Sequence, residues 1–199
     1  MKIPGIFLVA IGLSTSALAQ SRLQPQSPPP AQSTFNDSLA CARNHVTKTA
    51  MLTLGSWAVA NITSGFIVAG QTSGTTKYAW QMNAYWNFVN LGLAGMGYLR
   101  AVKEAHKTYS LLENYDAQNA LEKIYLFNLG LDLGYIGGGL YLRERGMNSA
   151  NSKTSAQLQG YGTSIVIQGG FLLLMDGVMI LIHRHNTQRV RQHLSIPQT

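Results

Sequence analysis

The sequence predicts an all-α fold, a bundle of four transmembrane helices that follows a signal peptide and a proline-rich linker. Charged residues make up only 12% of the chain, about half the share of an ordinary soluble domain. These charges are spaced so that four long windows are almost free of them. Each window contains roughly the twenty residues with which a helix crosses a hydrocarbon core of about 30 Å.

The first 48 residues precede the predicted membrane domain. Lys2 supplies a basic start, residues 6–13 an apolar run and residues 17–19 a small-residue cleavage site, which is the pattern of a secretory signal. We therefore assign residues 1–19 to a signal peptide, with an uncleaved anchor helix as the alternative. The next stretch holds four of the six prolines together with Gln and Ser. We assign residues 20–48 to a disordered linker and a pre-helix segment.

The charge-poor windows define a four-helix membrane domain at residues 49–185. The first two windows, on either side of Lys77, contain no charge at all. The third and fourth each contain one acid, Asp132 and Asp176 respectively. The predicted spans are residues 50–70, 80–100, 123–143 and 163–183, and residues 186–199 form a basic C-terminal tail.

A small outer-membrane β-barrel is the alternative fold. Residues 125–135 alternate apolar side chains with Asn128, Gly130, Asp132 and Gly134, as a barrel strand does. Residues 171–182 show no such alternation, and the windows are about twice as long as a barrel strand. We therefore favour the helical bundle.

The two indicators of membrane orientation disagree. A cleaved signal places the mature N-terminus outside, and four spans then return the C-terminus to the same side. On that topology ten Lys and Arg residues lie outside and four lie inside, against the usual excess of basic residues in cytoplasmic loops. We give priority to the signal and predict an exported N-terminus.

The third predicted span carries a glycine at every fourth position. Gly130, Gly134 and Gly138 therefore share one face of a helix. Small residues at this spacing let helix backbones approach closely in lipid, where packing drives association. We interpret these three glycines as a helix-packing face.

Polar side chains within the spans form the candidate site. An ionised Asp near the middle of a span costs about 2.5–3.5 kcal/mol on insertion scales, so we expect Asp132 to face the bundle interior and to be paired or protonated. The candidate intramembrane polar cluster consists of Asn61, Asn90, Asn128, Asp132, Gln168 and Asp176. Its acids either lie on a proton, ion or substrate path, or tie helices together by hydrogen bonds worth about 0.6 kcal/mol each.

Several classes of function have no sequence signal. The basic residues do not form a nucleic-acid-binding module, so we predict no nucleic-acid partner. No zinc, phosphate-loop or nucleophile-elbow motif is present. His183 and His185 flank Arg184 at the end of the fourth span, and we interpret them as interfacial side chains. We therefore predict a non-enzyme without catalytic, metal-binding or cofactor-binding residues.

Several short segments of the second half of the chain form a recognisable series. They are Glu122–Asn128, Gly130–Asp132, Gly137–Gly138, Leu140–Leu142, Arg143–Arg145, Gly160–Gly162 and Gln168–Leu173, followed by Asp176. This series resembles a family of uncharacterised bacterial multi-helix membrane proteins, a domain of unknown function, with an N-terminal signal sequence. The resemblance implies that Asn128, Asp132, Gln168 and Asp176 belong to a family pattern, and it implies no particular activity.

Two functional hypotheses follow. In the first, the chain is an integral protein of the bacterial inner (cytoplasmic) membrane, multi-pass, with no assignable biochemical activity and a structural or partner-binding role in the envelope. In the second, it is a small transporter, channel or proton-coupled component that uses Asp132 and Asp176. The lipid bilayer is the expected partner in both, and a homo-oligomer or another membrane protein is an open alternative for the protein partner.

Overall fold

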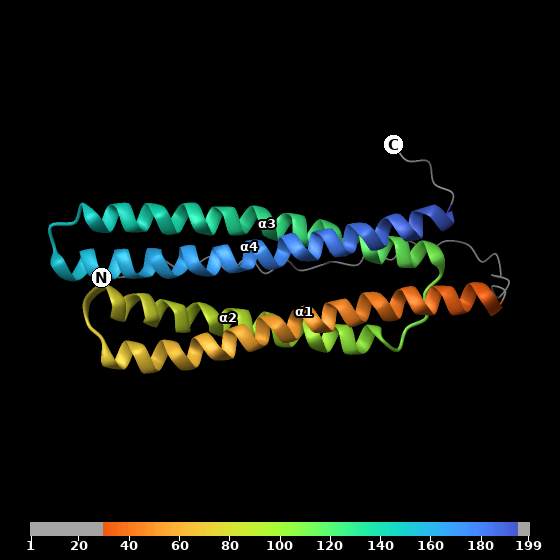
Figure 1. Cartoon of the computed structure of the whole chain (residues 1–199), viewed down its shortest axis with the longest axis horizontal. Helices are drawn as coiled ribbons and strands as arrows, with labels where there is room; N and C mark the ends of the chain where they lie inside the picture. Colours follow the sequence, from red (N-terminus) through yellow and green to blue (C-terminus); the bar gives the residue numbers. More distant parts are fainter. Residues whose placement is uncertain (1–29, 195–199) are drawn as a thin grey trace, which may run out of the picture.

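The computed structural model describes residues 30–194, which form four long helices (Figure 1). The helices are α1 (Pro30–Gln71), α2 (Gly74–Glu104), α3 (Leu111–Met147) and α4 (Ser152–Leu194). The described residues contain no strand, so the all-α prediction is confirmed and the barrel alternative is wrong. Each of the four predicted spans lies within a separate helix.

The helices pair into two antiparallel hairpins, α1 with α2 and α3 with α4 (Figure 1). The hairpins meet mainly through α2 and α4, and α1 scarcely touches α3. The short turns at residues 72–73 and 148–151 lie at one end of the bundle, which we call the turn end. The connection at residues 105–110 lies at the opposite end, beside the start of α1 and the end of α4, and we call this the tail end.

All four helices extend beyond the predicted spans, and α1 and α3 do so chiefly at the tail end. At about 1.5 Å per residue, the 42 residues of α1 cover roughly 63 Å, about twice the thickness of a hydrocarbon core. Residues 30–48, which we had assigned to the linker and pre-helix segment, are therefore helical. Pro30 is compatible with this because the first position of a helix needs no backbone N–H. The predicted signal, residues 1–19, lies outside the described residues, as do residues 20–29 of the linker.

Local sequence explains two of the helix ends. Gly74, which begins α2, has φ of 60°, a left-handed conformation that glycine adopts without steric strain, and this allows the chain to reverse within two residues. Ser110 and Glu113 form a capping box at the start of α3. The Ser110 hydroxyl accepts a 3.2 Å bond from the Glu113 backbone N–H, and the Glu113 carboxylate accepts a 2.7 Å bond from the Ser110 N–H.

The interior of the bundle is polar and its surface is apolar. The buried polar side chains include Asn83, Asn87, Asn90, Gln118, Asp132, Gln168, Asp176 and His183, whereas the buried apolar residues are mostly alanines. Large apolar side chains point outward, and Leu174 and Leu181 are 73% and 70% exposed. A soluble domain has the opposite arrangement. Extensive exposed apolar surface marks contact with a partner or a membrane.

Two of the helices are long and apolar enough to cross a membrane, by length and composition. They are the segments Ser33–Gln71 in α1 and Ser152–Gln192 in α4. Polar side chains in the middle of the other two helices are buried, namely Asn83, Asn87 and Asn90 of α2 and Asp132 of α3. The asparagine side chains lower the mean hydropathy of α2, although they face the interior of the bundle and not its surface.

The predicted helix-packing glycines are not the ones that the bundle uses. A Cβ atom added at Gly130, Gly134 or Gly138 would meet nothing within 4 Å, because this face of α3 points away from the other helices. The close contact lies one residue further on. A Cβ at Gly139 would stand 2.7 Å from the Gly162 carbonyl oxygen and 2.8 Å from the Val166 side chain. The interpretation of Gly130, Gly134 and Gly138 as contacts within the chain was therefore wrong.

Candidate functional site

The two acids of the third and fourth predicted spans meet between α3 and α4. Asp132 and Asp176 are only 3% and 4% exposed, and their carboxyl groups lie close enough to interact with each other. Two ionised carboxylates in one buried site repel each other, which favours a proton on one of them. The Asn128 side chain, one turn from Asp132, also interacts with Asp176. The predicted association of Asn128, Asp132 and Asp176 is thus present in the structure.

No basic side chain of the described residues interacts with this carboxyl pair. One oxygen of Asp132, Oδ2, is buried and has no hydrogen-bond partner within residues 30–194. A buried oxygen without a partner costs on the order of 1–3 kcal/mol. The pair is therefore arranged to hold a proton, and Asp132 retains a free oxygen that can accept a further bond.

The remaining predicted polar residues belong to a second cluster, which joins α1, α2 and α4. The Trp57 indole N–H donates a 3.0 Å bond to Gln168 Oε1, and the Gln168 amide donates to Asn83 Oδ1. Asn83 in turn donates a 2.7 Å bond to Asn61 Oδ1. The Asn61 amide donates to the Trp57 carbonyl at 2.7 Å, which closes the series.

Asn90 extends this second cluster along α2. Its amide donates a 3.2 Å bond to Asn87 Oδ1, and Asn87 donates a 2.8 Å bond to the Asn83 carbonyl. The prediction of one cluster from six residues is therefore replaced by two clusters. Asn83 and Asn87 were missed by the sequence analysis, although their spacing with Asn90 places all three on one face of a helix.

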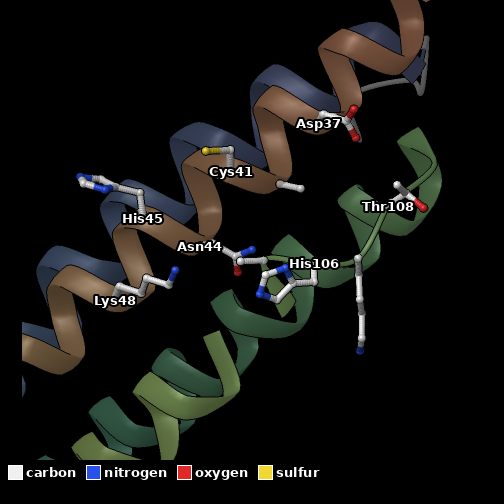
Figure 2. Close-up of a pocket in the computed structure, with 10 residues that line it drawn as sticks. Asp37, Cys41, Asn44, His45, Lys48, His106 and Thr108 are labelled. Carbon is white, nitrogen blue, oxygen red and sulfur yellow. The ribbon is translucent and has the colours of Figure 1, made fainter. Parts of the chain in front are cut away.

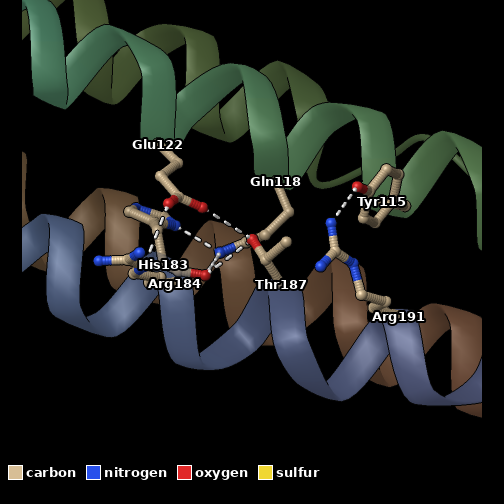
Figure 3. Close-up of polar contacts among 7 residues, drawn as sticks. All are labelled: Tyr115, Gln118, Glu122, His183, Arg184, Thr187 and Arg191. Carbon is tan, nitrogen blue, oxygen red and sulfur yellow. Dashed lines mark hydrogen bonds and ion pairs between the residues drawn. The ribbon is translucent and has the colours of Figure 1, made fainter. Parts of the chain in front are cut away.

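A third polar group lies at the tail end between α3 and α4 (Figure 3). The Gln118 amide nitrogen is 2.6 Å from His183 Nδ1 and donates a 3.0 Å bond to the His183 carbonyl. The Thr187 hydroxyl donates to the same carbonyl at 3.0 Å. Our interpretation of His183 as an interfacial side chain was wrong, because the ring is fully buried and stacks 5.3 Å from the Tyr125 ring.

A buried arginine completes the tail end. The Arg43 guanidinium donates a 2.6 Å bond to Asn114 Oδ1 and lies 4.6 Å from the centre of the Tyr109 ring. Burial lowers the pKa of Arg43, and the neighbouring Tyr109 and Glu104 partly offset this effect. Glu104 also receives bonds from Lys107, at 2.8 Å, and from the Tyr109 hydroxyl. The bond from Lys107, followed by that from Tyr109, holds the pKa of Glu104 below its usual value.

The described residues contain no group of three or more His, Cys, Asp or Glu side chains that could hold a metal ion.

Comparison with protein-family models gives one match. The model of the family of unknown function DUF6992 matches residues 53–177, well over half of the chain. The chain belongs to the DUF6992 family. The prediction of an uncharacterised family is thus confirmed. A search of curated proteins and a search of solved structures each returned no match.

The DUF6992 region contains both of the first two polar clusters and the connection at residues 105–110, and it excludes the start of α1 and the end of α4. Asn61, Asn83, Gln168, Asp132 and Asp176 all lie within residues 53–177. His183 of α4 and Arg43 of α1 lie outside it. The family match therefore covers the second and third predicted spans, most of the first and fourth, and the polar side chains between them.

Proposed function

We propose that this DUF6992 protein is a multi-pass integral protein of the bacterial inner membrane, in which all four helices cross the bilayer. The observation that carries the proposal is the reversed distribution of side chains, with amides and acids inside and large apolar groups outside. In lipid, apolar side chains need no burial, whereas polar ones have to find partners within the bundle. The proposal includes a structural or partner-binding role and no catalytic step.

The positions of the charged residues support this placement. Along α2, Lys77 and Arg100 stand roughly 35 Å apart at 1.5 Å per residue. Along α3, Lys123 and Arg143 stand about 30 Å apart. Both lengths agree with the thickness of a bilayer core of about 30 Å. On this proposal, the charges mark the two edges of an apolar belt formed by residues 50–70, 80–100, 123–143 and 163–183. The tail end of the bundle projects beyond this belt.

Arginine substitution on the outer surface tests the membrane proposal. Leu174 lies in the belt and is 73% exposed, whereas Leu112, also exposed, lies at the tail end. On the proposal, Leu174→Arg impairs membrane insertion, since an Arg near the centre of a span costs about 2.5–3.5 kcal/mol. Leu112→Arg is the matched control and leaves insertion unchanged. The readout is the fraction of full-length chain that stays in membranes after alkaline carbonate extraction, and equal retention of the two variants would contradict the proposal.

A second candidate function, proton coupling, is favoured by one observation. Asp132 and Asp176 form a buried carboxyl pair without a basic partner among the described residues. A pair of this kind binds a proton that can be exchanged, and intramembrane acids of other proteins form proton relays. We propose that the pair is the proton-carrying group if the protein couples to a proton gradient.

Amide substitution separates this candidate from a purely structural role. Asp132→Asn and Asp176→Asn keep the size of the side chain and a hydrogen-bond donor, so a structural pair tolerates them with little loss of thermal stability. A proton-carrying pair loses function. Proton flux into proteoliposomes that contain the full chain, read with an internal pH dye, should fall to the level of empty vesicles in both variants. Absence of flux with the unsubstituted chain would eliminate the proton-coupling candidate.

A further inference from the structure

A cleft at the tail end lies apart from the polar clusters described above (Figure 2). It has a volume of about 490 Å³ and lies between α1 and the connection from α2 to α3. Binding pockets for small molecules commonly measure roughly 300–1,000 Å³. The cleft is large enough to admit a ligand, and neither functional proposal makes use of it.

The floor of the cleft carries an amide without a partner. Asn44 is 7% exposed, lines the cleft and forms no hydrogen bond with any other described residue. Figure 2 shows its amide beside the imidazole of His106, with the Lys48 amine extending toward both. An amide that lines a cleft without a partner in the protein is free to bond water or a ligand. Asn44 therefore offers a donor and an acceptor to whatever enters the cleft.

The walls of the cleft are basic where they approach Asn44. Lys48 forms no ion pair with any acid in residues 30–194, so its ammonium group is available to a ligand. Lys107 also lines the cleft, but its amine already pairs with Glu104 at 2.8 Å. The acid of the lining, Asp37, lies at the far end beside Thr108 (Figure 2). The end of the cleft at Lys48 therefore offers three hydrogen-bond donors, which are the Lys48 ammonium group, the His106 ring and the Asn44 amide.

We propose that this cleft binds a phosphate group, held by the Lys48 ammonium, the His106 ring and the Asn44 amide. Phosphate suits this set because its several oxygen acceptors match donors that converge from different elements, and charge-assisted bonds to it are strong. On the proposed membrane placement, Lys48 precedes the first span by two residues and so lies near the level of phospholipid phosphates. The source of the phosphate is either a phospholipid headgroup or a soluble phosphate ester, and the lipid source rests on the proposed membrane placement.

Binding of glycerol 3-phosphate to the purified full-length chain in neutral detergent, followed by calorimetry, tests the cleft independently of the membrane. Lys48→Gln and His106→Gln should each weaken binding about tenfold, the loss expected for one charge-assisted bond. Asn44→Asp, which places a negative charge on the floor, should weaken it further. Lys153→Gln, an exposed lysine at the turn end, is the matched control and should bind as the unsubstituted chain does. Circular dichroism confirms that each variant is folded.

A second arm identifies the source of the phosphate. The chain is placed in nanodiscs of phosphatidylglycerol with phosphatidylcholine, and retained lipids are counted by native mass spectrometry. Retention of phosphatidylglycerol that is lost in Lys48→Gln but not in Lys153→Gln assigns a lipid headgroup, whereas binding of glycerol 3-phosphate without lipid retention assigns a soluble ester. Absence of both, or an equal loss in the control variant, overturns the proposal. A chain that fails to enter nanodiscs but binds glycerol 3-phosphate contradicts only the membrane placement.

Discussion

The Gln118 amide joins α3 to α4 by contacting two atoms of one residue, His183. It lies 2.6 Å from the ring nitrogen Nδ1 and 3.0 Å from the backbone carbonyl oxygen. Both side chains are buried, so the contact is shielded from bulk water. The contact fixes the position of α4 against α3 at the point where α4 leaves the apolar belt.

Gln118→Ala should therefore destabilise the bundle. The substitution leaves the buried ring nitrogen Nδ1 of His183 without its partner, at a cost of about 1–3 kcal/mol, whereas the His183 carbonyl keeps its bond from the Thr187 hydroxyl. Gln192→Ala, an exposed glutamine on α4, is the matched control and should have no measurable effect. Thermal unfolding in detergent, followed by circular dichroism, measures the difference. Equal melting temperatures of the two variants would show that the contact does not contribute to stability.

Neighbouring glycines of α3 should respond differently to alanine. Gly139→Ala forces a methyl group against the Gly162 carbonyl and the Val166 side chain, and overpacking of this kind costs about 1–3 kcal/mol. Gly138→Ala adds the same methyl group where nothing lies within 4 Å, so it should leave the fold intact. The same thermal measurement compares the two. Destabilisation by Gly138→Ala with tolerance of Gly139→Ala would reverse the assignment of the packing face.

The capping box predicts a dependence of stability on pH. Bonds from the Ser110 backbone and then its hydroxyl hold the pKa of Glu113 below its ordinary value of 4.5. A lowered pKa in the folded state means that the stabilisation is complete above pH 4.5 and is lost as the pH falls through the folded value.

Glu113→Gln should flatten this part of the pH profile, because an amide still accepts the capping bond but does not titrate. The effect is modest since Glu113 is exposed and solvent screens its charge. Melting temperatures between pH 3 and pH 6 provide the measurement, with the exposed acid substitution Glu144→Gln at the other end of α3 as control. Identical profiles for Glu113→Gln and the unsubstituted chain would exclude this contribution.

The single cysteine reports membrane orientation without any fusion. Cys41 is exposed and lies on α1 at the tail end. If the N-terminus is exported, a membrane-impermeant maleimide should label Cys41 in cells whose inner membrane is intact. The variant Cys41→Ser with Ala150→Cys moves the thiol to the turn end and should be labelled only after that membrane is opened. The opposite pair of results would place the tail end in the cytoplasm, as its excess of Lys and Arg favours.

The sequence predicted the elements of the fold more accurately than their contacts. All four spans lie in helices, and the pairing of Asp132 with Asp176 was anticipated from the cost of burying an acid in lipid. The sequence analysis did not predict that α1 begins at Pro30. The Pro, Gln and Ser content of residues 20–34 indicated a linker, and the whole stretch up to residue 48 was assigned with it. Asn83, Asn87 and His183 were also missed, since neutral side chains in a membrane helix are less conspicuous than charges.

What the sequence determined by itself was the set of helices, because each helix satisfies its backbone hydrogen bonds locally and a charge-poor window of about twenty residues specifies one. The tertiary structure alone decided which face of each helix turns inward. Gly138 and Gly139 are adjacent in sequence, yet one faces outward and the other meets Gly162. A repeat of small residues has the same spacing on either face, so only the approach of a second helix distinguishes them.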